Sequence, residues 1–288
     1  LSENGEARVA NTLFIPRMMS DSEARNAATG NVQIGGVDTY KIQNLLFGNG
    51  EQGSMFTPQP TLLGDQNLWQ MSDGTVIVNA DGDPVGRNDD VSGNGNHATQ
   101  PVSANRALYR ESEGLHWLES DGEGTYLSTT IPDTDVLSTG FMVAVAAEFL
   151  TDVDLRYLFS IGNTGSIDQY FGLRNRLGKY QVVIRDDDRT ELTNSTSVDV
   201  LSGPKVAVII VDGTTLRLRI DGAESSISIS ALTTLTVNVS AISCLVRDTV
   251  GLHSNNNYYG SVLVFCTPDD EEITAAEKYL SGLQGRTL

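Results

Sequence analysis

The chain has 288 residues, of which 37 are acidic and 19 are basic, so its formal net charge is −18 at pH 7. Hydrophobic residues make up 39% and aromatic residues 7%. This length leaves room for one large domain or two modest ones, and the composition excludes a coiled coil. Because a strongly negative surface repels phosphate backbones and anionic lipid, we expect neither nucleic acid nor a membrane as a partner.

Targeting signals and disulfides are not expected. No apolar run approaches the roughly 20 residues of a membrane span, and residues 1–4 lack the pattern of a signal peptide. Cys244 and Cys266 stand in apolar, strand-like runs. This setting favours buried free thiols over a disulfide between the two, although it leaves their pairing open.

Residues 1–60 differ from the rest in their Gly and Asn clusters, and only 18–28 has the pattern of a short helix. One interpretation is an N-terminal arm or connector that becomes ordered on a partner surface; the other is a segment that packs along the following domain. We assign 1–60 to the arm and 61–288 to the main domain, whose residues 61–120 form a turn-rich lead-in.

Strand-length segments dominate from about residue 125 onward. In the lead-in, only Thr75–Val78 has a clear strand pattern. The later segments are rich in Val, Ile, Phe or Tyr, and Gly, Asp or Asn separates most of them. They are 126–131, 141–149, 155–161, 170–174, 180–185, 206–211, 216–220, 235–239, 242–246 and 261–266.

The pattern around the Asp212-Gly213 dipeptide indicates how these strands associate. Asp-Gly tolerates the positive φ of a tight hairpin turn. After it, residues 216–220 alternate between aliphatic residues and Arg, as in an antiparallel strand with one buried face. Before it, 206–211 is apolar throughout, as in a strand inside a sandwich. We therefore predict an all-β antiparallel sandwich.

One helix is predicted at the end of the chain, over 268–283. Thr267 offers a capping hydroxyl, Pro268 suits the first helical position, and four acids follow where the helix dipole favours them. Apolar residues then recur at helical spacing, so the helix should dock on the sandwich along one stripe.

No catalytic constellation appears in the sequence. The Gly48-x-Gly50-x-x-Gly53 spacing matches a dinucleotide fingerprint, but Pro58 and Pro60 follow where a helix should open. The three histidines are far apart. Glycosidases on such sandwiches alternate acids along one strand, whereas Asp186–Asp188 are consecutive and should point in different directions. We therefore expect a protein that is not an enzyme.

Two candidate binding sites remain. Calcium, the one cofactor that the sequence suggests, takes oxygen ligands on loops, and Asp89, Asp90 and Asn94 offer them. Solvated turn residues are the alternative. For a sugar, the suggestive loop places three amides beside two rings that could stack on a pyranose; Asn255, Asn256, Asn257, Tyr258 and Tyr259 make up this loop. Its alternative is a polar loop that enters the last strand with one tyrosine in the core.

Several segments resemble phage and prophage virion proteins. They are 47–53 (FGNGEQG), 85–86 (VG), 90–100 (DVSGNGNHATQ), 118–127 (LESDGEGTYL) and 260–265 (GSVLVF) followed by the terminal helix. In those proteins a fibre or connector region precedes a concanavalin A-like, laminin-G-type lectin domain. The resemblance implies a jelly-roll sandwich on a tail fibre or another appendage at the particle surface, and it implies no ligand.

The leading hypothesis is thus a non-enzymatic virion component. Residues 1–60 would attach it to other virion subunits, as a homo-oligomer and most naturally a trimer, and the sandwich would bind host surface glycans. A purely structural or decorating role is a close alternative. A capsule depolymerase and a cellular laminin-G-like adhesion module are two more distant ones.

Overall fold

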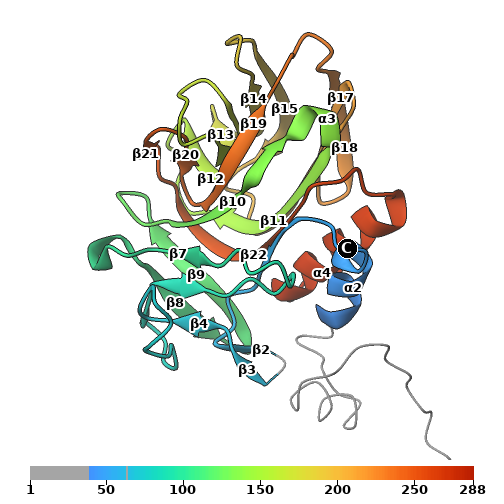
Figure 1. The fold of residues 1–288 in the computed structure, drawn as a ribbon. Helices are drawn as coiled ribbons and strands as arrows, with labels where there is room; N and C mark the ends of the chain where they lie inside the picture. The colour runs from blue at the N-terminus through green and yellow to red at the C-terminus, as the bar shows by residue number, and fades with distance from the viewer. Residues whose placement is uncertain (1–38, 63) are drawn as a thin grey trace, which may run out of the picture.

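A computed structural model describes residues 39–62 and 64–288. Within this part of the chain, two nine-stranded antiparallel sheets form a sandwich (Figure 1). The first, which we call the helix-covered sheet, has the order β18-β17-β16-β11-β22-β9-β8-β5, and β1 pairs with β22. The second, the opposite sheet, has the order β15-β14-β13-β12-β19-β10-β7-β6-β4. The predicted all-β antiparallel sandwich is confirmed.

The strands of the helix-covered sheet are β1 (Gly53–Phe56), β5 (Pro84–Val85), β8 (Ala107–Ser112), β9 (Leu115–Asp121), β11 (Phe141–Phe149), β16 (Lys205–Asp212), β17 (Thr215–Ile220), β18 (Ala223–Ser228) and β22 (Asn255–Val264). Those of the opposite sheet are β4 (Leu68–Trp69), β6 (Arg87–Asn88), β7 (Ala98–Thr99), β10 (Leu127–Asp135), β12 (Arg156–Gly162), β13 (Tyr170–Arg176), β14 (Lys179–Arg185), β15 (Glu191–Asp199) and β19 (Thr236–Ile242).

Two small hairpins and four short or terminal helical elements complete the description. The hairpins are β2 (Thr61–Leu62) with β3 (Asp65–Gln66), and β20 (Leu245–Val246) with β21 (Val250–Gly251). The helical elements are α2 (Thr39–Phe47), the 3-10 turn η1 (Ser103–Asn105), α3 (Val136–Thr139) and α4 (Asp270–Leu283). No helix in the described part of the chain has the length and apolar character that a membrane span needs.

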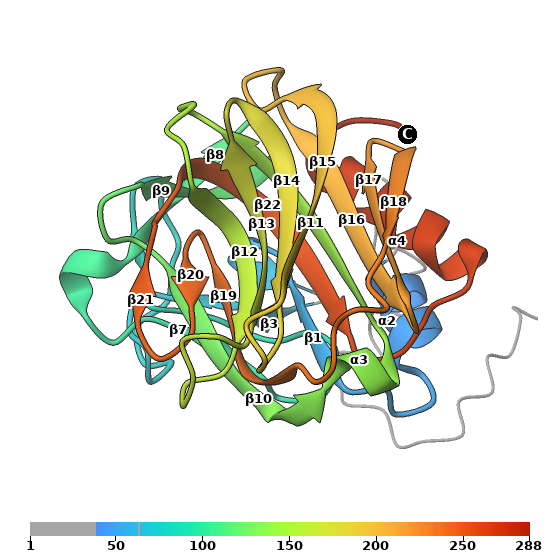
Figure 2. The same ribbon diagram turned by 90° about the horizontal axis from the view of Figure 1, so that it is seen from above.

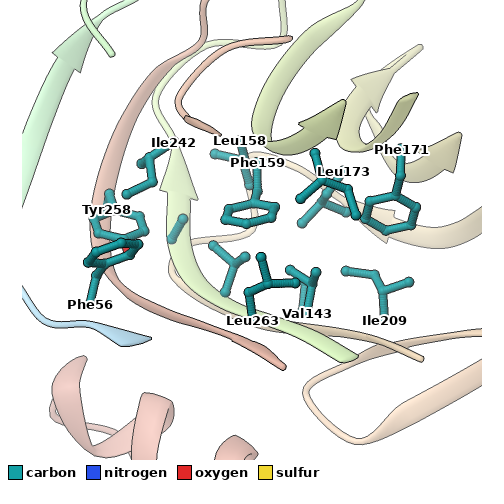
Figure 3. Packing of buried hydrophobic residues seen from close by; sticks show 14 of the residues in the cluster. Phe56, Val143, Leu158, Phe159, Phe171, Leu173, Ile209, Ile242, Tyr258 and Leu263 are labelled. Atoms are coloured by element: carbon teal, nitrogen blue, oxygen red, sulfur yellow. The ribbon is translucent and has the colours of Figure 1, made fainter. Parts of the chain in front are cut away.

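The main core lies between the two sheets. In Figure 3, Phe159, Phe171 and Leu173 of the opposite sheet face Val143 and Leu263 of the helix-covered sheet. All five side chains are buried. Burying an aliphatic or aromatic side chain of this size stabilises a fold by about 1.5–3 kcal/mol, so this layer supplies most of the driving force for folding.

A second apolar layer lies on the outer face of the helix-covered sheet. The helices α2 and α4 pack side by side there, against β11, β16 and β22 (Figures 1 and 2). This layer explains why β11 and β16 are apolar at nearly every position: one face of each strand meets the opposite sheet and the other meets the helices.

The predicted C-terminal helix is confirmed, but its cap is Asp269 instead of Thr267. The Asp269 carboxylate accepts hydrogen bonds from the backbone N–H groups of Glu271 and Glu272, and the Glu272 carboxylate accepts one from the Asp269 N–H. An ion pair between the half-buried Arg219 and the buried Glu277 then fixes the helix to the sheet. Arg219 Nε and Nη2 lie 2.9 and 2.8 Å from the two carboxylate oxygens of Glu277.

Residues 39–60 pack along the sandwich, as the second interpretation of the N-terminal region proposed. The helix α2 lies against α4, and β1 pairs with β22 from Gly53↔Val264 to Phe56↔Ser261. Residues 1–38 of the expected arm, including the helix expected at 18–28, lie outside the described residues. Both cysteines are free thiols: Cys244 is buried and Cys266 is half-buried.

The lead-in differs most from the expectation. Its short strands belong to both sheets, and the expected strand at Thr75–Val78 is wrong: only an isolated bridge joins Ile77 to Trp69. Val76 and Ile77 are 44% and 46% exposed. Val78 is 1% exposed and belongs to the main core, so the apolar pattern here reflects the burial of one side chain and not a paired strand.

Candidate functional site

The segment expected as a sugar-binding loop is a strand. Asn255–Tyr259 is the first half of β22, which pairs with β9 and β11 in the middle of the helix-covered sheet. The Asn256 and Tyr258 side chains are 0% and 1% exposed, so a ligand cannot reach them. The loop prediction is therefore wrong, and its alternative, a tyrosine in the core, is correct for Tyr258. Sugar binding through Asn255, Asn257 and Tyr259 stays a prediction.

Asp90, from the candidate calcium loop, organises the turn that follows it. Its Oδ1 accepts hydrogen bonds from the backbone N–H groups of Met55 and Ser92, both at 2.9 Å. Its Oδ2 accepts from Ser92 Oγ at 2.8 Å and from the Asn96 N–H at 2.9 Å. Because Met55 belongs to β1, this one carboxylate ties the 90–97 loop to the edge of the sheet.

The two asparagines of the same loop strengthen the tie to β1. Asn94 Nδ2 donates to the carbonyl oxygens of Glu51 and Gly53, and Asn96 Nδ2 donates to that of Gly53 at 2.7 Å. The D-V-S-G-N-G-N stretch is thus a structural clamp for β1. A Cβ on Gly53 would lie 2.0 Å from the Leu263 carbonyl oxygen, so only glycine fits at the clamped position.

Asp89 lies beside this clamp in a second set of contacts. Its Oδ2 accepts a hydrogen bond from Trp69 Nε1 at 2.8 Å, and its Oδ1 is paired with Arg87 Nε and lies 2.9 Å from His97 Nδ1. The Asn94 amide is turned toward backbone carbonyls instead of toward the two carboxylates. Among the described residues no group of three His, Cys, Asp or Glu side chains is placed to hold a metal ion. Calcium binding through Asp89, Asp90 and Asn94 stays a prediction.

Asp89 and Asp90 nevertheless line a pocket of about 380 Å³, which we call the polar pocket. Three parts of the chain that are distant in sequence form it: α2, the β2–β3 hairpin with the residue after it, and the 89–97 loop. The described lining residues are Tyr40, Gln43, Leu62, Asp65, Gln66, Asn67, Asp89, Asp90, Val91, Gly93 and His97. Planar polar side chains around one aromatic ring are a lining that suits a small hydroxyl-rich ligand.

Asn67 forms the most deeply buried polar part of this lining. Its side chain is 2% exposed, and its Nδ2 donates to the carbonyl oxygens of Thr57 and Gln59 at 2.7 and 2.9 Å. Neither of these two residues lines the pocket. The Asn67 Oδ1 has no hydrogen-bond partner within the described part of the chain. Because this oxygen has no accessible surface, Asn67 shapes the wall of the pocket through its bonds to the chain.

The outer face of the opposite sheet is also polar, but its groups satisfy one another. Arg174 Nε and Nη2 donate to Gln181 Oε1 at 2.8 and 2.6 Å, and Arg174 Nη1 donates to Tyr157 Oη at 2.9 Å. Gln181 Nε2 continues to Ser195 Oγ at 2.7 Å. Burial raises the pKa of Tyr157, so the phenol stays protonated. Leu245 of β20 packs onto this face. The polar groups of the network are therefore used within the fold and are not available to a ligand.

The consecutive acids Asp186–Asp188 converge, contrary to expectation. One oxygen of each carboxylate lies 3.0–3.2 Å from the hydroxyl of Thr233. Asp186 is fully buried and also accepts hydrogen bonds from the N–H groups of Thr190 and Thr233. The contacts between Asp186–Asp188 and Thr233 therefore join the β14–β15 turn to the loop before β19. Asp154, in another acidic loop, pairs with Arg176. The hydrogen bond from the Leu177 N–H and the charge of this arginine lower the pKa of Asp154.

Comparison with known proteins shows a likeness in fold alone. No protein-family model matches the sequence, and no curated protein matches it. Several solved structures match the fold of this chain. The binding domain of Paraclostridial Mosquitocidal Protein 1 matches with a TM-score of 0.55 and 11% identity, over 82% of this chain and 52% of that one.

A second match is the botulinum neurotoxin serotype D ligand binding domain in complex with N-acetylneuraminic acid. Its TM-score is 0.55 at 11% identity, over 86% of this chain and 56% of that one. The Ruminococcus gnavus sialidase CBM40 bound to α2,3-sialyllactose covers 50% of this chain and 91% of its own, at 16% identity and a TM-score of 0.41. The chain thus spans about half the length of the first two structures. It shares their β-sandwich architecture.

Proposed function

We propose that this protein is a non-catalytic, lectin-like glycan-binding module and that the polar pocket is its binding site. The observation that carries the proposal is the lining itself. Amides from Gln43, Gln66 and Asn67, the Tyr40 ring and three carboxylates surround about 380 Å³, which is room for one or two sugar rings. Such groups are the usual partners of sugar hydroxyls, since each can accept or donate in a fixed plane.

The fold comparison supports a binding role. The two structures with TM-scores of 0.55 are called a binding domain and a ligand binding domain, and the second is in complex with a sugar acid. A β-sandwich of this kind presents rigid rims, and loops that a rigid scaffold positions are common sites of recognition.

The contacts of the pocket acids favour binding over hydrolysis. A glycosidase needs one carboxyl group that can give a proton and a second that can take one or attack the sugar. Here the Asp90 carboxylate already accepts four hydrogen bonds, and Asp89 is engaged by Arg87 and Trp69. Because these two carboxylates are already occupied by contacts within the protein, they are suited to position the walls of a binding site and not to exchange protons with a sugar.

We also propose that this glycan-binding module is a component of a phage particle. The resemblance of 47–53 and 90–100 to virion proteins supports it. Residues 1–60 would contact other virion subunits, and the subunits would form a homo-oligomer, with a trimer as the expected state. Antibodies raised against the sandwich should label intact particles and block their adsorption to host cells. If fully labelled particles adsorb normally, the host-attachment role is refuted and a decorating role remains.

The test of glycan binding uses the full chain on a glycan array, followed by calorimetry with the best ligand. Replacing Gln43 with alanine should weaken binding about fivefold, as expected for the loss of roughly one hydrogen bond of about 1 kcal/mol. The matched control is Asn44→Ala, an exposed amide on the same helix that does not line the pocket. An array without any bound glycan would refute the function, and equal affinities of Gln43→Ala and Asn44→Ala would refute the site.

A further inference from the structure

Four loops at one end of the sandwich carry exposed aliphatic side chains. Three of them connect β11 to β12, β13 to β14 and β15 to β16, and the fourth precedes β22 (Figure 2). We call these four loops the apolar rim; they are 150–155, 177–178, 200–204 and 252–254. The large aliphatic side chains with exposed fractions between 37% and 76% on this rim are Leu150, Val153, Leu177, Leu201 and Leu252.

Hydrogen bonds hold these loops next to one another. The Leu177 N–H donates to Asp154 Oδ1 at 2.9 Å, which joins the β13–β14 turn to the β11–β12 loop. The Val200 N–H donates to the Gly178 carbonyl at 3.0 Å, which joins the β15–β16 loop to the same turn. The Leu150 N–H donates at 3.0 Å to the carbonyl of the first residue of β22. The exposed side chains therefore belong to neighbouring loops of one surface.

Leu177 is unfavourable in the isolated chain for two reasons. Leu177 and Gly178 form the two-residue turn between β13 and β14, with φ of 53° and 77°. Such a turn favours Asn or Gly at its first position, because a residue with a larger side chain is disfavoured at positive φ. The side chain is also 76% exposed. Since neither backbone conformation nor burial accounts for a leucine here, the residue indicates a contact with another surface.

The same combination recurs on the rim. Leu155 and Leu252 also have positive φ, of 57° and 54°. These two and Leu177 are the only leucines with positive φ in the described part of the chain, and all three lie on the rim. Ile167, an exposed aliphatic residue in the β12–β13 loop at the opposite end of the sandwich, does not share this conformation. The unusual leucines are therefore a property of one end of the molecule.

The size and the charge of the rim suit a second copy of this chain. With the strand residues that flank them, the four loops comprise about two dozen residues, and each side of a stable interface uses about 20–30. Two copies with a net charge of −18 each repel one another over most of their surfaces. On the rim and its flanks, acids and bases nearly balance: they are Asp152, Asp154 and Asp199 against Arg156, Arg176, Lys179 and Lys205.

We propose that the apolar rim is an interface at which two copies of this chain associate, rim against rim. A two-fold contact of this kind is self-complementary, so the aliphatic side chains of one copy cover those of the other. The rim shares no residue with the described lining of the polar pocket, and the inference is therefore independent of glycan binding. It is also distinct from the attachment proposed for residues 1–60.

The test is sedimentation equilibrium of the full chain over a range of micromolar concentrations, with the variant Leu177→Asn. This change creates Asn-Gly, the preferred pair for the turn, so the variant should unfold in urea at the same or a higher concentration than the parent chain. We expect it to raise the dissociation constant of the pair at least about tenfold, the loss of one buried leucine. The matched control is Ile167→Asn, which removes a 49% exposed aliphatic side chain at the opposite end. It should leave the dissociation constant unchanged.

Three results would overturn the inference. The first is a parent chain that sediments at the mass of one copy at every concentration. The second is an association that Leu177→Asn weakens no more than Ile167→Asn does, because the contact would then lie elsewhere, as in residues 1–60. The third is a chain that stays monomeric and sediments with phosphatidylcholine vesicles, which would assign the rim to a lipid surface.

Discussion

The Asp90 clamp allows a quantitative prediction for the substitution Asp90→Ala. The change removes four acceptor contacts at 2.8–2.9 Å, of which the one to the Met55 N–H is the most buried, since Met55 is 0% exposed. An unpaired buried N–H costs about 1–3 kcal/mol, and each of the three remaining donors loses about 0.5–1 kcal/mol. We therefore expect the free energy of unfolding to fall by about 2.5–6 kcal/mol.

Urea denaturation followed by circular dichroism measures this loss, and Asp73→Ala is the control. Asp73 also accepts two hydrogen bonds in a turn, from the N–H and the hydroxyl of Thr75, but it is exposed. Its replacement should cost less than about 1 kcal/mol. If Asp90→Ala costs no more than Asp73→Ala, then the clamp does not hold β1 in the sheet and the reasoning fails.

Three further predictions concern α4, the histidines and the buried thiol. Arg219→Ala leaves the Glu277 carboxylate buried and unpaired, so it should destabilise the fold by about 3 kcal/mol in urea, and Arg219→Met combined with Glu277→Leu should regain most of that loss. Burial lowers the pKa of His116 and of His253, so the unfolded chain binds more protons than the native one just below pH 6.5; stability should therefore decline as the pH falls through that range, and the decline should be shallower with both residues changed to Gln. Burial raises the pKa of the Cys244 thiol, so in a Cys266→Ser variant Ellman's reagent should label it only after denaturation; labelling of that variant in its native state would contradict the placement of Cys244 in the core.

The sequence predicted those strands that are buried on both faces. The bounds of β11 match the prediction, because Phe141–Phe149 is apolar at every position except Glu148 and Gly140 precedes it. The strands β15 and β18 were missed. They are edge strands rich in Ser, Thr and Glu, with a burial pattern that alternates between exposed and half-buried positions. Their pairing depends on β14 and β17, which no local pattern in β15 or β18 reports.

The candidate site was only partly predictable. Asp89 and Asp90 were identified as oxygen ligands on a loop, and both line the polar pocket. Gln43 and Asn67 were not identified, because helix and hairpin meet the 89–97 loop only through the tertiary fold. Asp90 itself gives a recognisable signal: an Asp two residues before a Ser, in a stretch of Gly and Asn, is typical of a turn in which the carboxylate binds backbone N–H groups.

The register of β1 against β22 has a mechanical consequence. Four residues of β1 pair along β22, and Asp90, Asn94 and Asn96 hold the same short segment from the other side. Because these contacts act on one short segment from two sides, β1 can leave the sheet only when they break together. Separation of the helix α2 from the sandwich is therefore coupled to the loss of the 90–97 turn.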